Sequence, residues 1–218
     1  MSETKVLVLL SGCGVFDGSE IHESVITLLA LSKLGATAVV AAPDKDQAHV
    51  INHQLGQPSE ETRNVLVESA RIARGPALPL QNVSAEDYDA VFLPGGFGAA
   101  KNLNSFAFDG AGCTIDSEVE RILQEFHGAG KPIGAICIAP TVVVRALGKG
   151  IVTIGSDPET ASAIEAMGGN HMACAVTEIA IDPENKIVTA PAYMCEASLA
   201  DIATGIERAV EATVNLAG

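Results

Sequence analysis

The sequence predicts a single α/β domain spanning residues 1–218, built on an open, mostly parallel sheet with helices on both faces. Strand and helix signals alternate along the whole chain, which is the pattern of doubly wound sheets. Trp is absent and only two Tyr and six Phe are present, so Val, Ile, Leu and Ala must build the core, as in parallel sheets covered by helices. A length of 218 residues suits one large domain, and no linker, repeat or low-complexity tract divides it.

Local signals set the bounds of the elements. The first strand is a continuous apolar run, and Asp17 is placed to cap the first helix, with Glu20 three residues on. That helix has a predicted apolar face of Ile21, Val25, Leu28, Leu29 and Leu31, and Gly35 ends it. The predicted strands are 5–10, 37–42, 90–93, 132–136, 150–154, 176–181 and 186–190. The first predicted helix ends at about 33, and the others cover about 63–73, 116–129, 139–147, 157–167 and 198–214. Residues 44–62 and 99–115 are irregular insertions.

Charge and cysteine content narrow the class of partner. The net charge of −14 repels phosphate backbones and anionic lipids, so we expect neither nucleic acid nor a membrane as partner. There is no apolar run long enough to span a bilayer, and the N-terminal residues lack the features of a secretory signal, so we expect a cytoplasmic protein. The five cysteines are widely spaced without a Cys-x-x-Cys pair, which predicts free thiols and no metal site.

Three predicted strand ends carry unusual chemistry: 11–14 with the helix start at 20–23, 94–98, and 136–140. In open parallel sheets, ligands bind at the carboxyl ends of the strands. The glycines of the first segment are spaced wrongly for a dinucleotide fingerprint, and no phosphate-binding loop motif is present. At the second, Gly95 and Gly96 free the backbone to point N–H groups into a cavity, and the alternative is a simple turn without a binding role.

Cys137 follows a strand directly and precedes a helix, as the serine of a nucleophile elbow does. The helix N-terminus would lower the thiol pKa from about 8.5 toward neutrality, which makes a nucleophile. The alternative is a buried thiol at a strand end, a common fate of free cysteine. Local sequence leaves both interpretations open.

Longer blocks then resemble a known family. Ala-Ile-Cys-Ile-Ala-Pro at 135–140, Leu-Pro-Gly-Gly at 93–96 and the early Glu23 resemble the PfpI-type branch of the class I glutamine amidotransferase-like superfamily. The blocks at 11–23, 52–53, 61–65, 94–103 and 191–194 are similar to its ElbB-type glyoxalases, and the similarity covers essentially the whole chain. This resemblance implies a flavodoxin-like three-layer sandwich, a nucleophilic cysteine at the elbow, and a homodimer.

The resemblance also implies that Glu23 lies against the sulfur of Cys137. Glu20, Gly12 and Gly95 are further candidates for the substrate pocket, and for Glu20 the alternative is a solvated first-turn acid stabilised by the helix dipole. The histidines that related enzymes use are missing: one expected position reads Tyr-Met-Cys-Glu at 193–196, and the other reads Ile-Gly-Ser at 154–156. A Cys-His-Glu triad is therefore not available from either position. His171 and His22 are not expected to take part, His22 because its helix phase differs from that of Glu23 by about 100°.

These residues favour a cofactor-independent glyoxalase that converts glyoxal to glycolate, or a deglycase that shares the first adduct. Cys137 would add to an aldehyde carbon, and Glu23 would move a proton between neighbouring carbons. Backbone N–H groups of Gly96 and Ile138 would hold the oxyanion. The alternative function is a non-enzymatic redox sensor, or an accessory protein of isoprenoid metabolism, with a reversibly oxidised Cys137.

Overall fold

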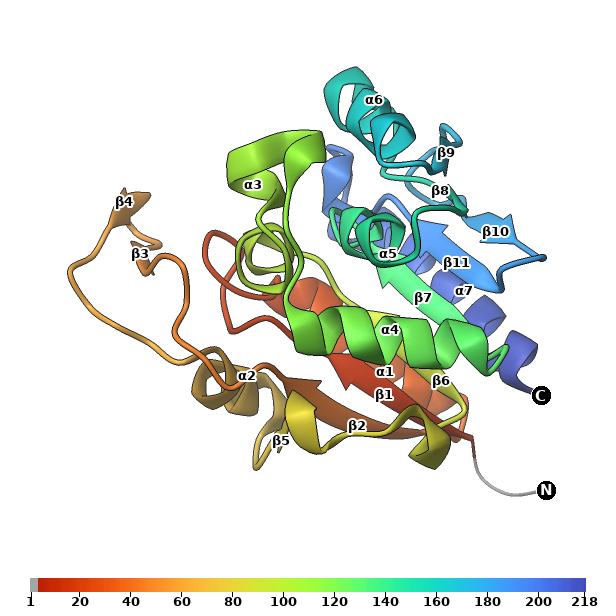
Figure 1. The fold of residues 1–218 in the computed structure, drawn as a ribbon, viewed down its shortest axis with the longest axis horizontal. Coiled ribbons are helices and arrows are strands. Elements are labelled where there is room, and N and C mark those ends of the chain that lie inside the picture. Colours follow the sequence, from red (N-terminus) through yellow and green to blue (C-terminus); the bar gives the residue numbers. More distant parts are fainter. Residues whose placement is uncertain (1–3) are drawn as a thin grey trace.

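The computed structural model describes residues 4–218, and its centre is a seven-stranded sheet in the order β10-β11-β7-β6-β1-β2-β5 (Figure 1). Every neighbouring pair is parallel except β10 and β11. The strands are β1 (Lys5–Leu9), β2 (Thr37–Ala42), β5 (Leu78–Pro79), β6 (Ala90–Leu93), β7 (Ile133–Ile136), β10 (Ala180–Asp182) and β11 (Ile187–Ala190). The predicted flavodoxin-like, mostly parallel architecture is confirmed.

Helices cover both faces of this sheet. The helices are α1 (Ile21–Lys33), α2 (Val65–Ala73), α3 (Phe106–Asp109), α4 (Ser117–Gly128), α5 (Pro140–Leu147), α6 (Pro158–Ala166) and α7 (Leu199–Ala217). On one face α4 and α5 pack together over β6 and β7, while α1 and α7 pack together on the other (Figure 1). No helix within residues 4–218 has the length and apolar character needed to cross a membrane.

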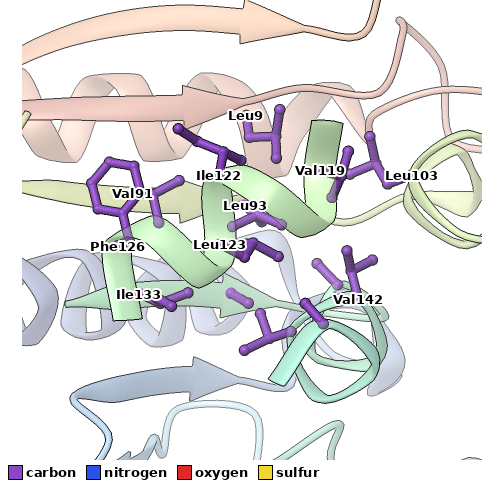
Figure 2. Packing of buried hydrophobic residues seen from close by; sticks show 14 of the residues in the cluster. Leu9, Val91, Leu93, Leu103, Val119, Ile122, Leu123, Phe126, Ile133 and Val142 are labelled. Carbon is purple, nitrogen blue, oxygen red and sulfur yellow. The ribbon is translucent and has the colours of Figure 1, made fainter. Parts of the chain in front are cut away.

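Two hydrophobic cores result, one on each side of the sheet. The period-two alternation of a strand sends Leu7 and Leu9 of β1 into one core, and Val6 and Val8 into the other. Figure 2 shows the core beneath α4, where Phe126 and its neighbours on that helix pack against side chains of the strands. With two apolar faces the strands are continuously hydrophobic, as the sequence predicts for a buried sheet.

The insertions and the C-terminal region differ in part from the predicted elements. Within 44–62 the strands β3 (Ile51–Asn52) and β4 (Gln57–Pro58) form a hairpin. The predicted strand at 150–154 is reduced to β8 (Ile151–Val152), which pairs with β9 (Asn170–His171) in a separate two-stranded sheet. In place of the predicted strand at 176–181, the shorter β10 begins at Ala180 and pairs antiparallel with β11.

The start of α1 is a correction to the predicted cap. Glu20, not Asp17, is the N-cap: its Oε2 accepts a hydrogen bond of 2.7 Å from the N–H of Glu23. Asp17 is buried and instead accepts a bond of 2.7 Å from the N–H of Ile51. Asp17 therefore connects the first loop to the 44–62 insertion and is not available to cap α1.

The predicted apolar face of α1 is mostly wrong. Ile21, Val25 and Leu29 are 45%, 49% and 50% exposed. The helix buries instead a face of mostly small and polar residues: Glu23, Ser24, Thr27, Ala30 and Leu31. This rotation aims Glu23 at the carboxyl edge of the sheet, where the loops after the neighbouring strands β1, β6 and β7 converge.

Candidate active site

Cys137 occupies the turn between β7 and α5 with a φ of +60°, in the left-handed region that a cysteine rarely adopts. Such a conformation costs about 1–3 kcal/mol and persists only where the surroundings impose it. Here the N–H of Cys137 is held by the carbonyl of Ala190 at 3.0 Å. The predicted strand–turn–helix elbow is present, and Cys137 is only 7% exposed.

Glu23 reaches the same point from the first turn of α1 and is completely buried. Its Oε2 accepts a hydrogen bond of 2.8 Å from the N–H of Gly95, and its Oε1 accepts one of 3.3 Å from the N–H of Tyr193. The carboxyl group is also hydrogen-bonded to the thiol of Cys137. Contacts from Gly95, Cys137 and Tyr193, which are far apart in the sequence, thus fix the Glu23 carboxyl beside the sulfur.

The side chains of Cys137 and Glu23 lie so close to the Pro-Gly-Gly turn after β6 that the turn requires glycine. A Cβ at Gly95 would lie 2.9 Å from Sγ of Cys137 and 2.8 Å from Oε2 of Glu23, so no side chain fits there. Gly96 has a φ of +94°, which favours glycine. The N–H groups of Gly96 and Ile138 both bond to the sulfur of Cys137, so the two predicted donors converge on the reacting atom.

Burial dominates the electrostatics of the pair. Desolvation, followed by the charge of nearby Glu20, raises the pKa of Glu23 to about 7. Desolvation also raises the pKa of Cys137 well above its ordinary value; the carboxylate of Glu23 adds to this rise, and the N–H groups of Gly96 and Ile138 oppose it. The predicted lowering of the thiol pKa is therefore wrong, because loss of water outweighs the N–H groups at the turn.

Of the other residues predicted for the substrate pocket, only Glu20 lines the cavity. Glu20 is nearly buried and lines the cavity, while its N–H bonds to the carbonyl of Gly95 at 2.9 Å. Gly12 and Gly95, the other predicted candidates, are not among the lining residues. The N–H of Gly12 is bonded to Oγ of Ser69 at 2.9 Å, while Gly95 packs against Cys137 and Glu23. Gly12 therefore packs toward α2, while Val15 of the same loop lines the cavity.

A cavity of about 500 Å³ opens in front of Cys137. It is lined by Val15, Glu20, Gly96, Phe97, Ala100, Phe106, Ala107, Cys137, Ile138, Asp157, Thr160, Tyr193 and Met194. The insertion at 99–115 supplies part of the wall through Phe106 and Ala107 of α3. The start of α6 supplies another part through Asp157 and Thr160.

Tyr193 is a site residue that the sequence interpretation missed. Its backbone holds Glu23, its side chain lines the cavity, and its hydroxyl lies 2.7 Å from Nδ1 of His22. His22 points away from Glu23, as its helix phase predicts, yet contacts the site through this tyrosine. The available signal was the position of Tyr193 just beyond a strand end. His171 lies elsewhere, near the N–H of Ile154.

These groups can perform addition and proton transfer. A thiol, a carboxyl that titrates near neutrality and two N–H donors meet at one end of the cavity. Among residues 4–218 no cluster of three or more His, Cys, Asp or Glu side chains is arranged to hold a metal ion. A thiol beside such a carboxyl supports nucleophilic attack by sulfur, with the carboxyl as acid and base.

Comparison with known proteins gives several full-length relatives. The chain is 51% identical to human glutamine amidotransferase-like class 1 domain-containing protein 3, mitochondrial, over 98% of this chain and 84% of that protein. It is 50% identical to the ES1 protein homolog, mitochondrial, of Rattus norvegicus, with the same shares covered. An isoprenoid biosynthesis protein with amidotransferase-like domain from Ehrlichia chaffeensis superimposes with a TM-score of 0.92, at 40% identity, over 98% of this chain and 99% of that one.

These relatives correct the predicted location and establish the family. The expected cytoplasmic location is contradicted, because the human and rat relatives are described as mitochondrial. The lack of a membrane-spanning run and of a secretory signal argues against insertion and export, but it does not separate one internal compartment from another. The sequence pattern of the DJ-1/PfpI family matches residues 4–193. The chain belongs to the DJ-1/PfpI family.

Proposed function

We propose that this chain is a glutathione-independent glyoxalase of the ElbB type, which converts glyoxal to glycolate at Cys137. The observation that carries this proposal is the buried, hydrogen-bonded pair of the Cys137 thiol and the Glu23 carboxyl. The cavity lining within the described residues contains no histidine. Glu23 is therefore the group in contact with the sulfur that can take its proton.

The first step is addition of sulfur to an aldehyde carbon. The Cys137 S–H proton passes to the Glu23 carboxylate as the new C–S bond forms. The resting enzyme therefore does not need a deprotonated Cys137. The pKa of about 7 for Glu23 suits a group that must both accept and return a proton. The N–H groups of Gly96 and Ile138, released from the sulfur as it becomes a thioether, bind the new alkoxide. Return of the proton to that oxygen gives a hemithioacetal.

The second step moves a proton between the two carbons. Glu23, ionised again, removes the proton from the carbon bonded to sulfur, and the electron pair forms an enediolate with the neighbouring carbonyl. The hydroxyl proton of the first carbon then passes to the oxygen of the second. Glu23 then delivers a proton to the second carbon, and the product is a thioester of glycolate. Water cleaves the thioester and restores the thiol. One glyoxal and one water give one glycolic acid, with one carbon oxidised and the other reduced, so no external oxidant or cofactor is needed.

Turnover of glyoxal by variants tests this proposal. We expect Cys137→Ala and Glu23→Gln each to lower kcat/KM by about 10²–10⁴-fold. Cys113→Ala is the matched control, because Cys113 is also a fully buried thiol but packs near Met167 and does not line the cavity. We expect it to keep wild-type activity. Wild-type turnover of glyoxal by Cys137→Ala would refute the proposal.

The isotope content of the product tests the role of Glu23 separately. A carboxyl that exchanges its proton with solvent should place one deuterium on the second carbon of glycolate when turnover is run in D₂O and followed by NMR. Deuterium there would exclude a direct hydride shift between the two carbons, and Glu23→Gln that incorporates it at the wild-type rate would contradict proton transfer through Glu23. A protein deglycase would share the first adduct, and measuring glyoxal loss with and without a free glycated amine distinguishes the two activities.

A further inference from the structure

A second cavity lies between the two insertions of the fold. It measures about 180 Å³ and is lined by Lys45, Lys101, Asn102, Leu103, Asn104, Ser105, Thr114, Ile115 and Asp116. Among residues 4–218, none of these also lines the cavity in front of Cys137. With about 30 Å³ for each heavy atom, the share of one water molecule in the liquid, the space holds about six heavy atoms, and a phosphate ion has five.

Hydrogen bonds within the chain hold the backbone around this second cavity. The N–H of Ser105 donates to the carbonyl of Thr114 at 3.0 Å, and the N–H of Asp116 donates to the carbonyl of Leu103 at 2.9 Å. Asn102 is buried, and its amide group is hydrogen-bonded to the loops that follow β1 and β2. The side chains that line the cavity are therefore carried by a fixed backbone.

Two lysines line this cavity in a chain whose net charge is −14. Nζ of Lys45 donates to Oδ2 of Asp116 at 2.7 Å. Nζ of Lys101 donates to the carbonyl of Phe16 at 2.9 Å and lies 5.3 Å from the centre of the Phe97 ring. Because an ammonium group has three N–H donors, each lysine keeps donors beyond these bonds. Asp116 is the one carboxyl group in the described lining, so the lysines leave a net positive charge there.

Two polar groups of this lining are not fully compensated within residues 4–218. Desolvation lowers the pKa of Lys101, although the charge of Asp17 opposes this change. Nδ2 of Asn104 has no hydrogen-bond partner, and the residue is only 4% exposed, while its Oδ1 accepts a bond of 3.0 Å from the N–H of Phe106. A buried donor without an acceptor is unfavourable, so both groups would gain from an anion placed between them.

We propose that this second cavity binds a phosphate group, as inorganic phosphate or as a phosphate monoester whose organic part extends into solvent. Lys45 and Lys101 supply the positive charge, as lysine does at other phosphate sites. Nδ2 of Asn104 donates to one oxygen. The hydroxyls of Ser105 and Thr114 lie 3.3 Å apart, so one can donate to the other and the second to the phosphate. The bound group joins the 44–62 and 99–115 insertions, and this role does not depend on the proposed function.

Titration of the whole chain with inorganic phosphate, methyl phosphate and acetate, followed by amide NMR at constant ionic strength, tests this proposal. We expect saturable shifts at Ser105 and Thr114 with a phosphate, and binding of acetate at least about fivefold weaker. Tighter binding of inorganic phosphate than of methyl phosphate would identify the free ion as the occupant, and the reverse would identify a monoester. No saturable shift with either phosphate up to about 50 mM would overturn the proposal.

Charge-matched variants locate the binding. Lys101→Gln should weaken the binding of phosphate at least about fivefold, and Lys101→Arg, which keeps the charge, should retain most of it. Thr114→Val removes a hydroxyl without changing the charge and should also weaken binding. Lys149→Gln is the control, because Lys149 is exposed and does not line this cavity. Equal affinity of Lys101→Gln and the wild type, or an equal loss in Lys149→Gln, would show that the anion responds only to net charge and would overturn the proposal.

Discussion

Replacing Glu23 with glutamine tests whether burial governs the site. Burial raises the pKa of this carboxyl from 4.5 to about 7, so the folded protein binds the proton more tightly than the unfolded chain does. A group of this kind contributes stability that is present in full below the unfolded pKa and is lost as the pH rises through the folded pKa. Stability should therefore fall between about pH 4.5 and about pH 8, and Glu23→Gln should remove this dependence.

The magnitude follows from the shift. The difference between 7 and 4.5 is 2.5 pKa units, and each unit corresponds to about 1.36 kcal/mol, which gives about 3 kcal/mol. That is a large part of the roughly 5–15 kcal/mol by which a typical domain is stable. The ionised enzyme therefore has a less stable fold, and the strain lies at the carboxyl that the proposed reaction uses.

Urea unfolding of the wild type and the variant across this pH range measures the effect. The free energy of unfolding of the wild type minus that of Glu23→Gln should fall by about 3 kcal/mol from about pH 5 to about pH 8. Subtraction cancels the other carboxyl groups. Glu165→Gln, at an exposed position on α6, serves as the control and should give a nearly constant difference. A constant difference for Glu23→Gln, within about 0.5 kcal/mol, would refute the argument from burial.

Two further predictions concern activity. The wild-type kcat/KM for a dicarbonyl should rise with pH and reach half its plateau near 7, because the ionised form of Glu23 accepts the thiol proton; a profile that stays flat through neutrality would contradict that role. Gly95→Ala should lower kcat/KM at least about a hundredfold, because its Cβ would lie 2.8 Å from Oε2 of Glu23. Gly128→Ala, at the end of α4 with open space around it, should change nothing in the same assay. Equal activity of these two glycine variants would show that the pair tolerates displacement.

Structural features that depend on a few consecutive residues could be predicted from the sequence. The apolar strands, the turn at Cys137 and the double glycine each follow from a few consecutive residues, and the rule that strands of a parallel sheet share one carboxyl edge brings them together. Glu23 was reached through the resemblance, and the structure places it against the sulfur. The homodimer implied by the same resemblance stays a prediction.

Other features depend on what surrounds each residue and were missed. Periodicity assigns Ile21, Val25 and Leu29 to the core, because it counts apolar side chains and cannot know that Glu23 must face inward. The helix N-terminus suggests a low thiol pKa, but the degree of burial that reverses this is a tertiary property. The cavity walls come from segments separated by up to about 180 positions in the sequence, as Val15 and Met194 show.

The raised pKa of Cys137 distinguishes the two functions that the sequence left open. A redox sensor needs an accessible, standing thiolate for peroxide to oxidise, whereas Cys137 is nearly buried and is held as a thiol by desolvation and by the charge of Glu23. An enzyme that transfers the proton during addition has no such requirement. A sulfur with a high pKa is also the stronger nucleophile once its proton leaves. With Glu23 hydrogen-bonded to it, the thiol loses its proton as the C–S bond forms. Burial therefore shields the sulfur from peroxide at rest, which argues against the sensor, and the proposed reaction depends on Glu23 to take the thiol proton as the C–S bond forms.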